Sequence, residues 1–263
     1  KGNLCLRDFN MDVEHFKHVV TLDRLNVEME DFNPEKKIFH IGTIELDALK
    51  MNFEIDKNGS SFSTLFPSDT TEQQTSDVKQ KKQKKEKKRK KASKNETMVI
   101  ESSNANVQPD IRLNHLVLND CEVNFTDRTL KDAVMTLPVS DITVDAHNLS
   151  SKTLSKASMY AHFGKTGEFH CKWEGYLSSQ GNQVIDLEIK DLQVQELSPY
   201  SLHYFAYPIS KGVLVYKGRT TLQNQELDSK NHFDFYNLVV DKKRKDIEPE
   251  YKLPLQAAAY VLT

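Results

Sequence analysis

The chain has 263 residues, a formal net charge of −2 and nine glycines and eight prolines, too few for a fibrous protein. This length can bury a sizeable core. No run of 18 apolar residues is present to cross a bilayer as a helix. The sequence opens on Lys1 without a signal segment and stops within an apolar run at Thr263, so we expect it to be cut from a longer protein, with any membrane anchor outside it.

Before residue 60, period-two hydrophobicity predicts β-strands. Apolar residues alternate in patches over residues 4–29 and again over residues 37–46. The clearest strand alternates Leu49, Met51, Phe53 and Ile55 with Lys50, Asn52 and Glu54. We therefore predict an N-terminal β unit over residues 1–59.

Residues 60–108 differ in composition, because Ser, Thr, Gln, Lys and Glu dominate and large apolar residues almost vanish after Phe66. Such a segment buries too little apolar area to offset its ordering entropy, which predicts a disordered insertion. The run from Lys79 to Lys94 carries eleven Lys or Arg and one Glu, about +10. The rest of the chain holds 25 basic and 37 acidic residues, about −12.

Two kinds of partner are considered for this basic run, nucleic acid and anionic lipid. Nucleic acid is disfavoured, because no aromatic residues interleave with the lysines and the remaining surface is acidic. Contact of a solvated loop with anionic lipid headgroups is favoured, since each Lys near such a surface contributes about 1 kcal/mol. We expect a lipid or membrane partner and no nucleic acid.

After the insertion the strand pattern returns at a spacing of 72 residues. The earlier positions are Ile41, Ile44, Leu46, Met51, Asn52 and Phe53, and the later ones are Leu113, Leu116, Leu118, Val123, Asn124 and Phe125. This echo predicts one β unit written twice and stacked along an axis. Four further strand-like runs follow, at residues 141–150, 156–163, 167–177 and 182–194. None of their connections fits a crossover helix, which favours an antiparallel meander.

A short helix is predicted over residues 199–206. Ser198 has the form of an N-cap and Pro199 that of a first-turn proline, while Pro208 cannot continue a helix. Lys211-Gly212 then predicts a turn before the next strand. The fold we predict is mainly β, an elongated curved antiparallel sheet of repeated units with one or two short helices.

The order of segments over residues 110–263 resembles AsmA-like envelope proteins of Gram-negative bacteria, the AsmA/TamB superfamily, in particular a branch of unassigned function. Residues 1–60 join the resemblance only through the repeat. The matching positions are Pro199, Tyr200, Tyr207, Ile209, Lys211, Gly212 and Leu214, followed by Leu253, Pro254 and Leu255. Two departures are Ala206, where glycine is common, and the Lys-rich insertion.

The resemblance implies an AsmA-like β domain over residues 109–263 in the periplasm, anchored in the inner membrane by an upstream segment. It also implies binding or conduction of lipid acyl chains, in service of outer-membrane biogenesis. The residues alone agree in one respect, because too little helix is available to cover so much sheet. Candidate groove residues are Leu49, Met51, Phe53, Val123, Phe125, Phe169 and Trp173. The alternative is a closed, non-catalytic structural or adaptor domain that binds envelope proteins.

We predict no catalytic, cofactor or metal site and no small-molecule substrate. Neither GxSxG nor HExxH occurs. His162, His170 and Cys171 could meet across a hairpin, but no fourth metal ligand accompanies them. Cys5, Cys121 and Cys171 are too widely spaced for a CxxC site, and one disulfide among them stays open. The sequence therefore favours a protein that is not an enzyme.

Overall fold

The computed structural model describes residues 1–13, 16–57, 59–62, 109–131, 133–177 and 181–251. The insertion predicted for residues 60–108 therefore lies outside the described residues except at 60–62, and so does the basic run from Lys79 to Lys94. The three matching positions Leu253, Pro254 and Leu255 also lie outside them.

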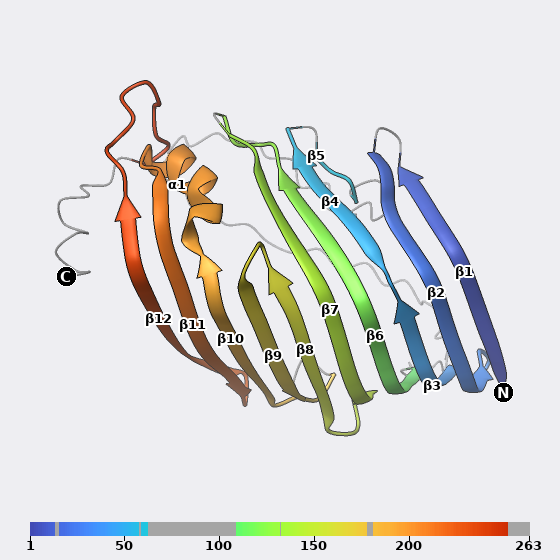
Figure 1. Ribbon diagram of the computed structural model, residues 1–263. Coiled ribbons are helices and arrows are strands. Elements are labelled where there is room, and N and C mark those ends of the chain that lie inside the picture. Colours follow the sequence, from blue (N-terminus) through green and yellow to red (C-terminus); the bar gives the residue numbers. More distant parts are fainter. Residues whose placement is uncertain (14–15, 58, 63–108, 132, 178–180, 252–263) are drawn as a thin grey trace, which may run out of the picture.

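Within the described residues, twelve strands form one sheet, and Figure 1 shows them side by side in a single layer. The strands are β1 (Gly2–Val13), β2 (Phe16–Asn33), β3 (Ile38–Asp47), β4 (Lys50–Asp56), β5 (Gly59–Ser60), β6 (Asp110–Asp127), β7 (Met135–Ser150), β8 (Ser155–Phe163), β9 (Gly167–Gly175), β10 (Gln183–Gln193), β11 (Ile209–Gln223) and β12 (Glu226–Val240). The mainly β fold predicted from hydrophobic alternation is confirmed.

β3 and β4 together take the place of one strand between β2 and β6. β2 is antiparallel to both, whereas β6 runs parallel to both, pairing first with β3 and then with β4. All other paired strands are antiparallel. The prediction of a wholly antiparallel sheet is wrong here, because the long connection after β5 returns the chain to the start of β3 and so permits parallel pairing.

The 72-residue echo in the sequence is a side-by-side pairing in the structure. Residues of β3 and β4 pair with the β6 residues 72 positions later. Equivalent side chains also touch: Asn124 Nδ2 donates a hydrogen bond to Asn52 Oδ1 at 3.1 Å, and the rings of Phe53 and Phe125 stack with centroids 5.8 Å apart. The second copy thus uses the first as its neighbour in the sheet.

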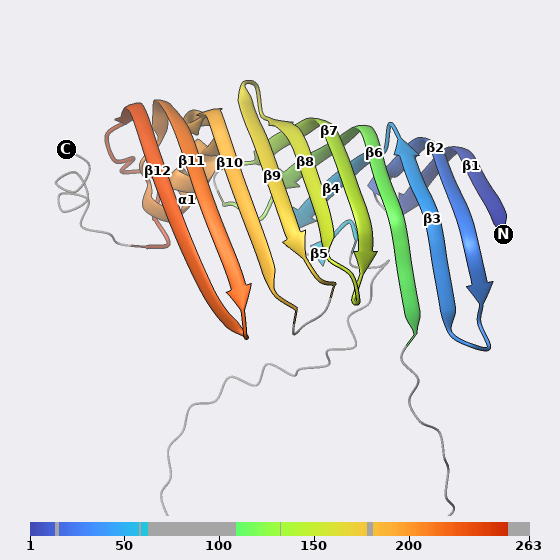
Figure 2. The same ribbon diagram turned by 90° about the horizontal axis from the view of Figure 1, so that it is seen from below.

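Left-handed residues interrupt several strands. Asp120 in β6, Asp141 in β7 and Asp191 in β10 have φ angles of 51°, 50° and 52°, and each lies where the pairing register shifts. Asp tolerates this conformation better than most residues, because its short polar side chain can hydrogen-bond locally. Such bulges bend a strand and increase its twist, and Figure 2 shows strands that change direction along their length.

The bulges also keep apolar side chains on one face. Leu118 and Cys121 flank the β6 bulge three positions apart, yet both pack in the same hydrophobic cluster. Ile189 and Leu192 do the same around the β10 bulge, in a second cluster. Residues three apart in a regular strand point to opposite faces, so the added residue restores the phase.

The predicted short helix is present as α1 (Ser198–Phe205), preceded by the 3-10 turn η1 (Val194–Leu197), near one end of β10 and β11 in Figure 1. Pro199 lies in its first turn, as predicted. Ser198 is not the N-cap, because its Oγ accepts a hydrogen bond from the backbone N–H of Ile209 at 2.8 Å. Among the described residues, neither helical segment has the length and apolar character that a membrane crossing requires.

The chain after α1 departs from the predicted turn. Ala206, at the position where the resemblance favours glycine, is buried and left-handed with φ 61°, and it ends the helix. Lys211 and Gly212 do not form a turn, because both lie within β11, where Gly212 has φ 151° and the register to β12 shifts. The glycine accommodates a bulge rather than a chain reversal.

α1 is tied to the end of β6 through a tyrosine. Tyr200 Oη donates a hydrogen bond to Asp127 Oδ2 at 3.0 Å. Asp127 is buried and also accepts from the backbone N–H and the hydroxyl of Thr129, at 2.8 and 2.6 Å. Desolvation, and then the Asp127 carboxylate, raise the pKa of Tyr200 to about 12. The pair therefore stabilises α1 against the sheet only while Tyr200 keeps its proton.

Substitution at the β6 bulge tests the role of left-handed backbone. Asp120 is exposed, so Asp120→Val acts mainly through φ and is expected to lower the free energy of unfolding by about 1–2 kcal/mol. Asp120→Gly is expected to change it by less than about 1 kcal/mol. Asp228→Val, at an exposed β12 position without a positive φ, is the control for replacing an aspartate by a β-branched residue. Denaturant unfolding measures all three, and equal effects of Val and Gly at position 120 would contradict the account.

Removal of the Tyr200 hydroxyl tests the docking of α1. Tyr200→Phe is expected to cost about 1 kcal/mol of unfolding free energy near neutral pH. Because the folded pKa is raised above the ordinary value of 10.0, this stabilisation is complete below pH 10 and is lost as the pH rises toward 12. The wild-type advantage should therefore shrink over that interval in denaturant titrations. Tyr236→Phe, at an exposed tyrosine on β12, serves as control. An advantage independent of pH would rule out the pairing.

Candidate functional site: the apolar face

One face of the sheet carries an unbroken row of apolar side chains. Each member of the row is the register partner of the next across the neighbouring strand, and partners in register share a face. From β1 to β10 the row consists of Leu6, Leu25, Leu46, Leu118, Val144, Met159, Cys171 and Leu187. We call the side of the sheet that bears this row the apolar face.

The structure places the predicted groove residues on this face in two groups. Leu49, Val123 and Phe169 pack against a cluster whose buried centre is Cys121, Ile142 and Ala161. Met51 and Phe53 of β4 continue it as register partners of Val123 and Phe125. Trp173 lies further along β9, between Ala157 and Ile185 in register, and its Nε1 donates to Gln183 Oε1 at 3.4 Å.

The apolar face is only partly buried. All seven predicted residues are half-buried. Toward the sheet edges the apolar side chains are open, with Leu4 on β1 52% exposed and Phe233 and Phe235 on β12 56% and 42% exposed. A sandwich core would cover such residues with a second sheet. Within the described part of the chain there is one sheet and no second layer over this face.

The helical residues cover only one corner of the apolar face. Leu197 of η1 packs on the cluster of Leu192, Val194 and Leu214. α1 contacts β11 only sparsely and does not extend over the middle strands. The described helical residues therefore leave most of the apolar face uncovered.

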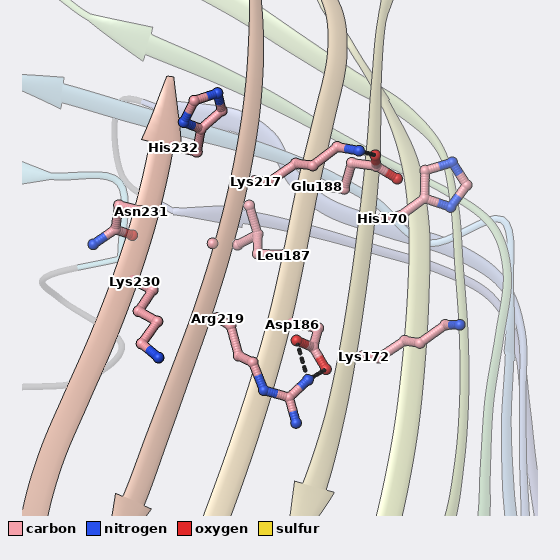
Figure 3. A pocket seen from close by; sticks show the side chains of 11 residues that line it. His170, Lys172, Asp186, Leu187, Glu188, Lys217, Arg219, Lys230, Asn231 and His232 are labelled. Carbon is pink, nitrogen blue, oxygen red and sulfur yellow. Dashed lines mark hydrogen bonds and ion pairs between the residues drawn. The ribbon is translucent and has the colours of Figure 1, made fainter. Parts of the chain in front are cut away.

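The opposite, polar face has a different chemistry. Figure 3 shows charged side chains of β9 to β12 lining a hollow of about 460 Å³ there. Arg219 binds both carboxylate oxygens of Asp186 at 2.8 and 2.9 Å, and Lys217 Nζ lies 3.2 Å from Glu188 Oε1. Lys217, followed by Lys190, lowers the pKa of Glu188. A hollow with these charges suits polar ligands rather than hydrocarbon.

The histidine and cysteine trio considered from sequence does not converge. Tyr160 is the register partner of His170, and His162 lies two positions further along β8, so both histidines share the polar face. His162 Nδ1 lies 2.9 Å from Asp141 Oδ2. Cys171 points to the apolar face, because neighbouring residues of a strand alternate sides. These three residues cannot form a metal site together.

Sequence reasoning missed a cluster on the polar face, formed by His115 of β6 and Asp145 and His147 of β7. The spacing Asp-x-His places the last two on one side of a strand. Only the pairing of His115 with His147 brings the third member in, and that register is not visible in the sequence. The local Asp-x-His signal could have raised the question but not answered it.

All three cysteines are free thiols, which settles the disulfide alternative for this structure. Cys5 is exposed, Cys121 is buried and Cys171 is half-buried. Desolvation raises the pKa of both Cys121 and Cys171. These two thiols are therefore neutral, apolar members of the face that they line.

Comparison of the chain with protein-family models, with curated proteins and with solved structures finds no match. The AsmA-like resemblance therefore stays a prediction, and the geometry of the two faces carries the functional argument.

Thiol reactivity tests whether the apolar face is open. We expect Ellman's reagent to modify Cys5 fastest, Cys171 more slowly and Cys121 slowest, because the thiolate is the reactive form and burial suppresses both the thiolate and access. Single-cysteine variants, with the other two thiols replaced by alanine, give each rate separately. Equal protection of Cys171 and Cys121 would indicate a sealed face.

Proposed function

We propose that the apolar face binds lipid acyl chains and that the protein is a non-catalytic lipid-binding or lipid-conducting domain. One observation carries the proposal: the apolar row is continuous from β1 to β10, and the described residues leave it without a second layer. Exposed apolar surfaces of this kind mark binding sites for a ligand, a membrane or a partner. Acyl chains fit because the row has no polar group that demands a partner.

In such a domain the two faces have different roles. The polar face, with ion pairs such as that between Arg219 and Asp186, keeps one side of the single layer in water. The apolar face, with its half-buried aromatic side chains, offers the hydrocarbon contacts. A one-layer sheet can carry an acyl chain along its surface without enclosing it, so the proposal includes movement along the row as well as binding.

The cellular setting is proposed from the resemblance to AsmA-like proteins. It comprises the periplasm, an inner-membrane anchor upstream of this chain and a role in outer-membrane biogenesis. Lipids or a membrane surface are then the main partners.

An adaptor function is the second candidate. β1 and β12 are the two long edge strands of the described sheet, and β12 exposes Phe233, Phe235 and Tyr236. Unpaired edges with apolar side chains can accept a strand from another protein. The partner in that case is an envelope protein rather than a lipid.

Lipid analysis of gently purified protein tests the first proposal. We expect phospholipid to co-purify and to be detected by mass spectrometry after extraction. Bound acyl chains should also slow modification of Cys171, which lies in the apolar row, and leave Cys5 unchanged. Protein that carries no lipid and gains no protection of Cys171 from added phospholipid would refute acyl-chain binding.

A charge on the apolar face separates the two candidates. Phe125→Asp removes the stacking on Phe53 and is expected to abolish lipid binding, while the loss of the aromatic contact costs about 1 kcal/mol of stability. Thr136→Asp is the matched control, since Thr136 is exposed on β7 and pairs with Thr126 rather than with the apolar row. Unfolding of the Phe125→Asp protein, with Thr136→Asp intact, would instead indicate that this face is a closed core, which would exclude acyl-chain binding there and leave the adaptor as the remaining candidate.

A further inference from the structure

We propose that His115, Asp145 and His147 form a binding site for a divalent transition-metal cation of the zinc type, on the polar face between β6 and β7. This site is separate from the apolar face and does not depend on lipid binding. These three residues have no role in the proposed lipid binding.

The three side chains lie close together, with both histidines in contact with the carboxylate of Asp145. His115 Nε2 lies 3.1 Å from Asp145 Oδ2, and His147 Nε2 lies 2.6 Å from Asp145 Oδ1. The two imidazole rings stack with centroids 4.3 Å apart and planes 11° from parallel. Both rings thus direct the same nitrogen toward one carboxylate.

The ligand separations match a small coordination sphere. Zinc binds His nitrogen and carboxylate oxygen at about 2.0–2.2 Å, so two ligands of one tetrahedral ion lie about 3.3 Å apart. The His–Asp separations already have that scale, and all three ligand atoms lie within 4.8 Å of one another. Small rotations of side chains that are 34–54% exposed can bring the nitrogens to the ion. Solvent then supplies the remaining coordination position.

The sheet holds the ligands without help from a loop. Asp145 and His147 are two positions apart on β7, and His115 is the register partner of His147 on β6, so the backbone ladder fixes all three. Two imidazoles and one carboxylate favour borderline cations such as Zn²⁺, Ni²⁺ or Cu²⁺ over Mg²⁺ or Ca²⁺, which prefer oxygen ligands. A bound ion joins β6 to β7.

The lysine that pairs in register with His147 does not block the site. Lys156 of β8 is the register partner of His147, but its ammonium lies 3.1 Å from Glu174 Oε2. Thr43 of β3, the partner of His115 on the other side, is uncharged. Metal binding requires each Nε2 to present its lone pair, so the ring proton resides on Nδ1 in the loaded form.

Titration of the full chain, purified without a polyhistidine tag, with Zn²⁺ tests the site. We expect one saturable site by calorimetry. His115→Gln, Asp145→Asn and His147→Gln should each weaken it about tenfold or more, which is the scale typical for loss of groups that support a metal. The ¹⁵N resonances of both Nε2 atoms should shift on binding. The melting temperature should rise with Zn²⁺ and fall back on addition of EDTA.

A matched control lies on β12. His232 Nε2 is 3.1 Å from Asp234 Oδ1 at the same two-residue spacing on one strand, but among the described residues no second histidine converges on that pair. His232→Gln should leave the affinity for Zn²⁺ and the thermal shift unchanged. No saturable binding up to about 1 mM Zn²⁺, or binding that survives both His115→Gln and His147→Gln in folded protein, would overturn the proposal.

Discussion

The fold depends on one constraint: a strand must bend while its apolar side chains stay on the same face. The structure meets it with an added left-handed residue, and the local sequence is an apolar residue, any residue, Asp and another apolar residue. This four-residue pattern surrounds Asp8, Asp120, Asp141 and Asp191, all with positive φ. Ala48, between β3 and β4, lies 72 positions before Asp120 and has the same conformation. Without that residue, the apolar side chains that follow it in the strand would point to the polar face.

Because the phase is preserved, the two faces of a single layer remain chemically distinct over many strands. One face collects half-buried aliphatic and aromatic groups, and the other collects carboxylates, lysines and histidines in ion pairs. Single-layer sheets of this extent have little interior: the buried cysteine, isoleucine and alanine at the centre of the main cluster form one of few sealed spots in the described residues. Stability therefore comes from the backbone ladder and cross-strand pairs more than from a three-dimensional core.

Much of this could be predicted from local patterns. Period-two alternation locates the strands and puts Leu49, Phe53 and Phe125 on one face, and the proline in LSPYSL locates the helix. The 72-residue echo indicates the repeat, but not that the copies pair in parallel, because pairing direction depends on where a long connection returns. The cluster at His115 could not be predicted for a related reason, because cross-strand register is a long-range property. The N-cap prediction for Ser198 is wrong because its hydroxyl has a better partner in β11.

The parallel pairing of β6 with β3 and β4 sets a minimum length for the connection that leads to β6. β6 has 18 residues and begins beside Ile38, so the chain that leaves β4 must travel back about 60 Å before β6 can start. At the reach of an extended chain, roughly 18 residues are the shortest segment that permits this return. Insertions between the two copies can therefore vary freely in sequence and grow in length, while deletions below that limit would force the second copy out of register with the first.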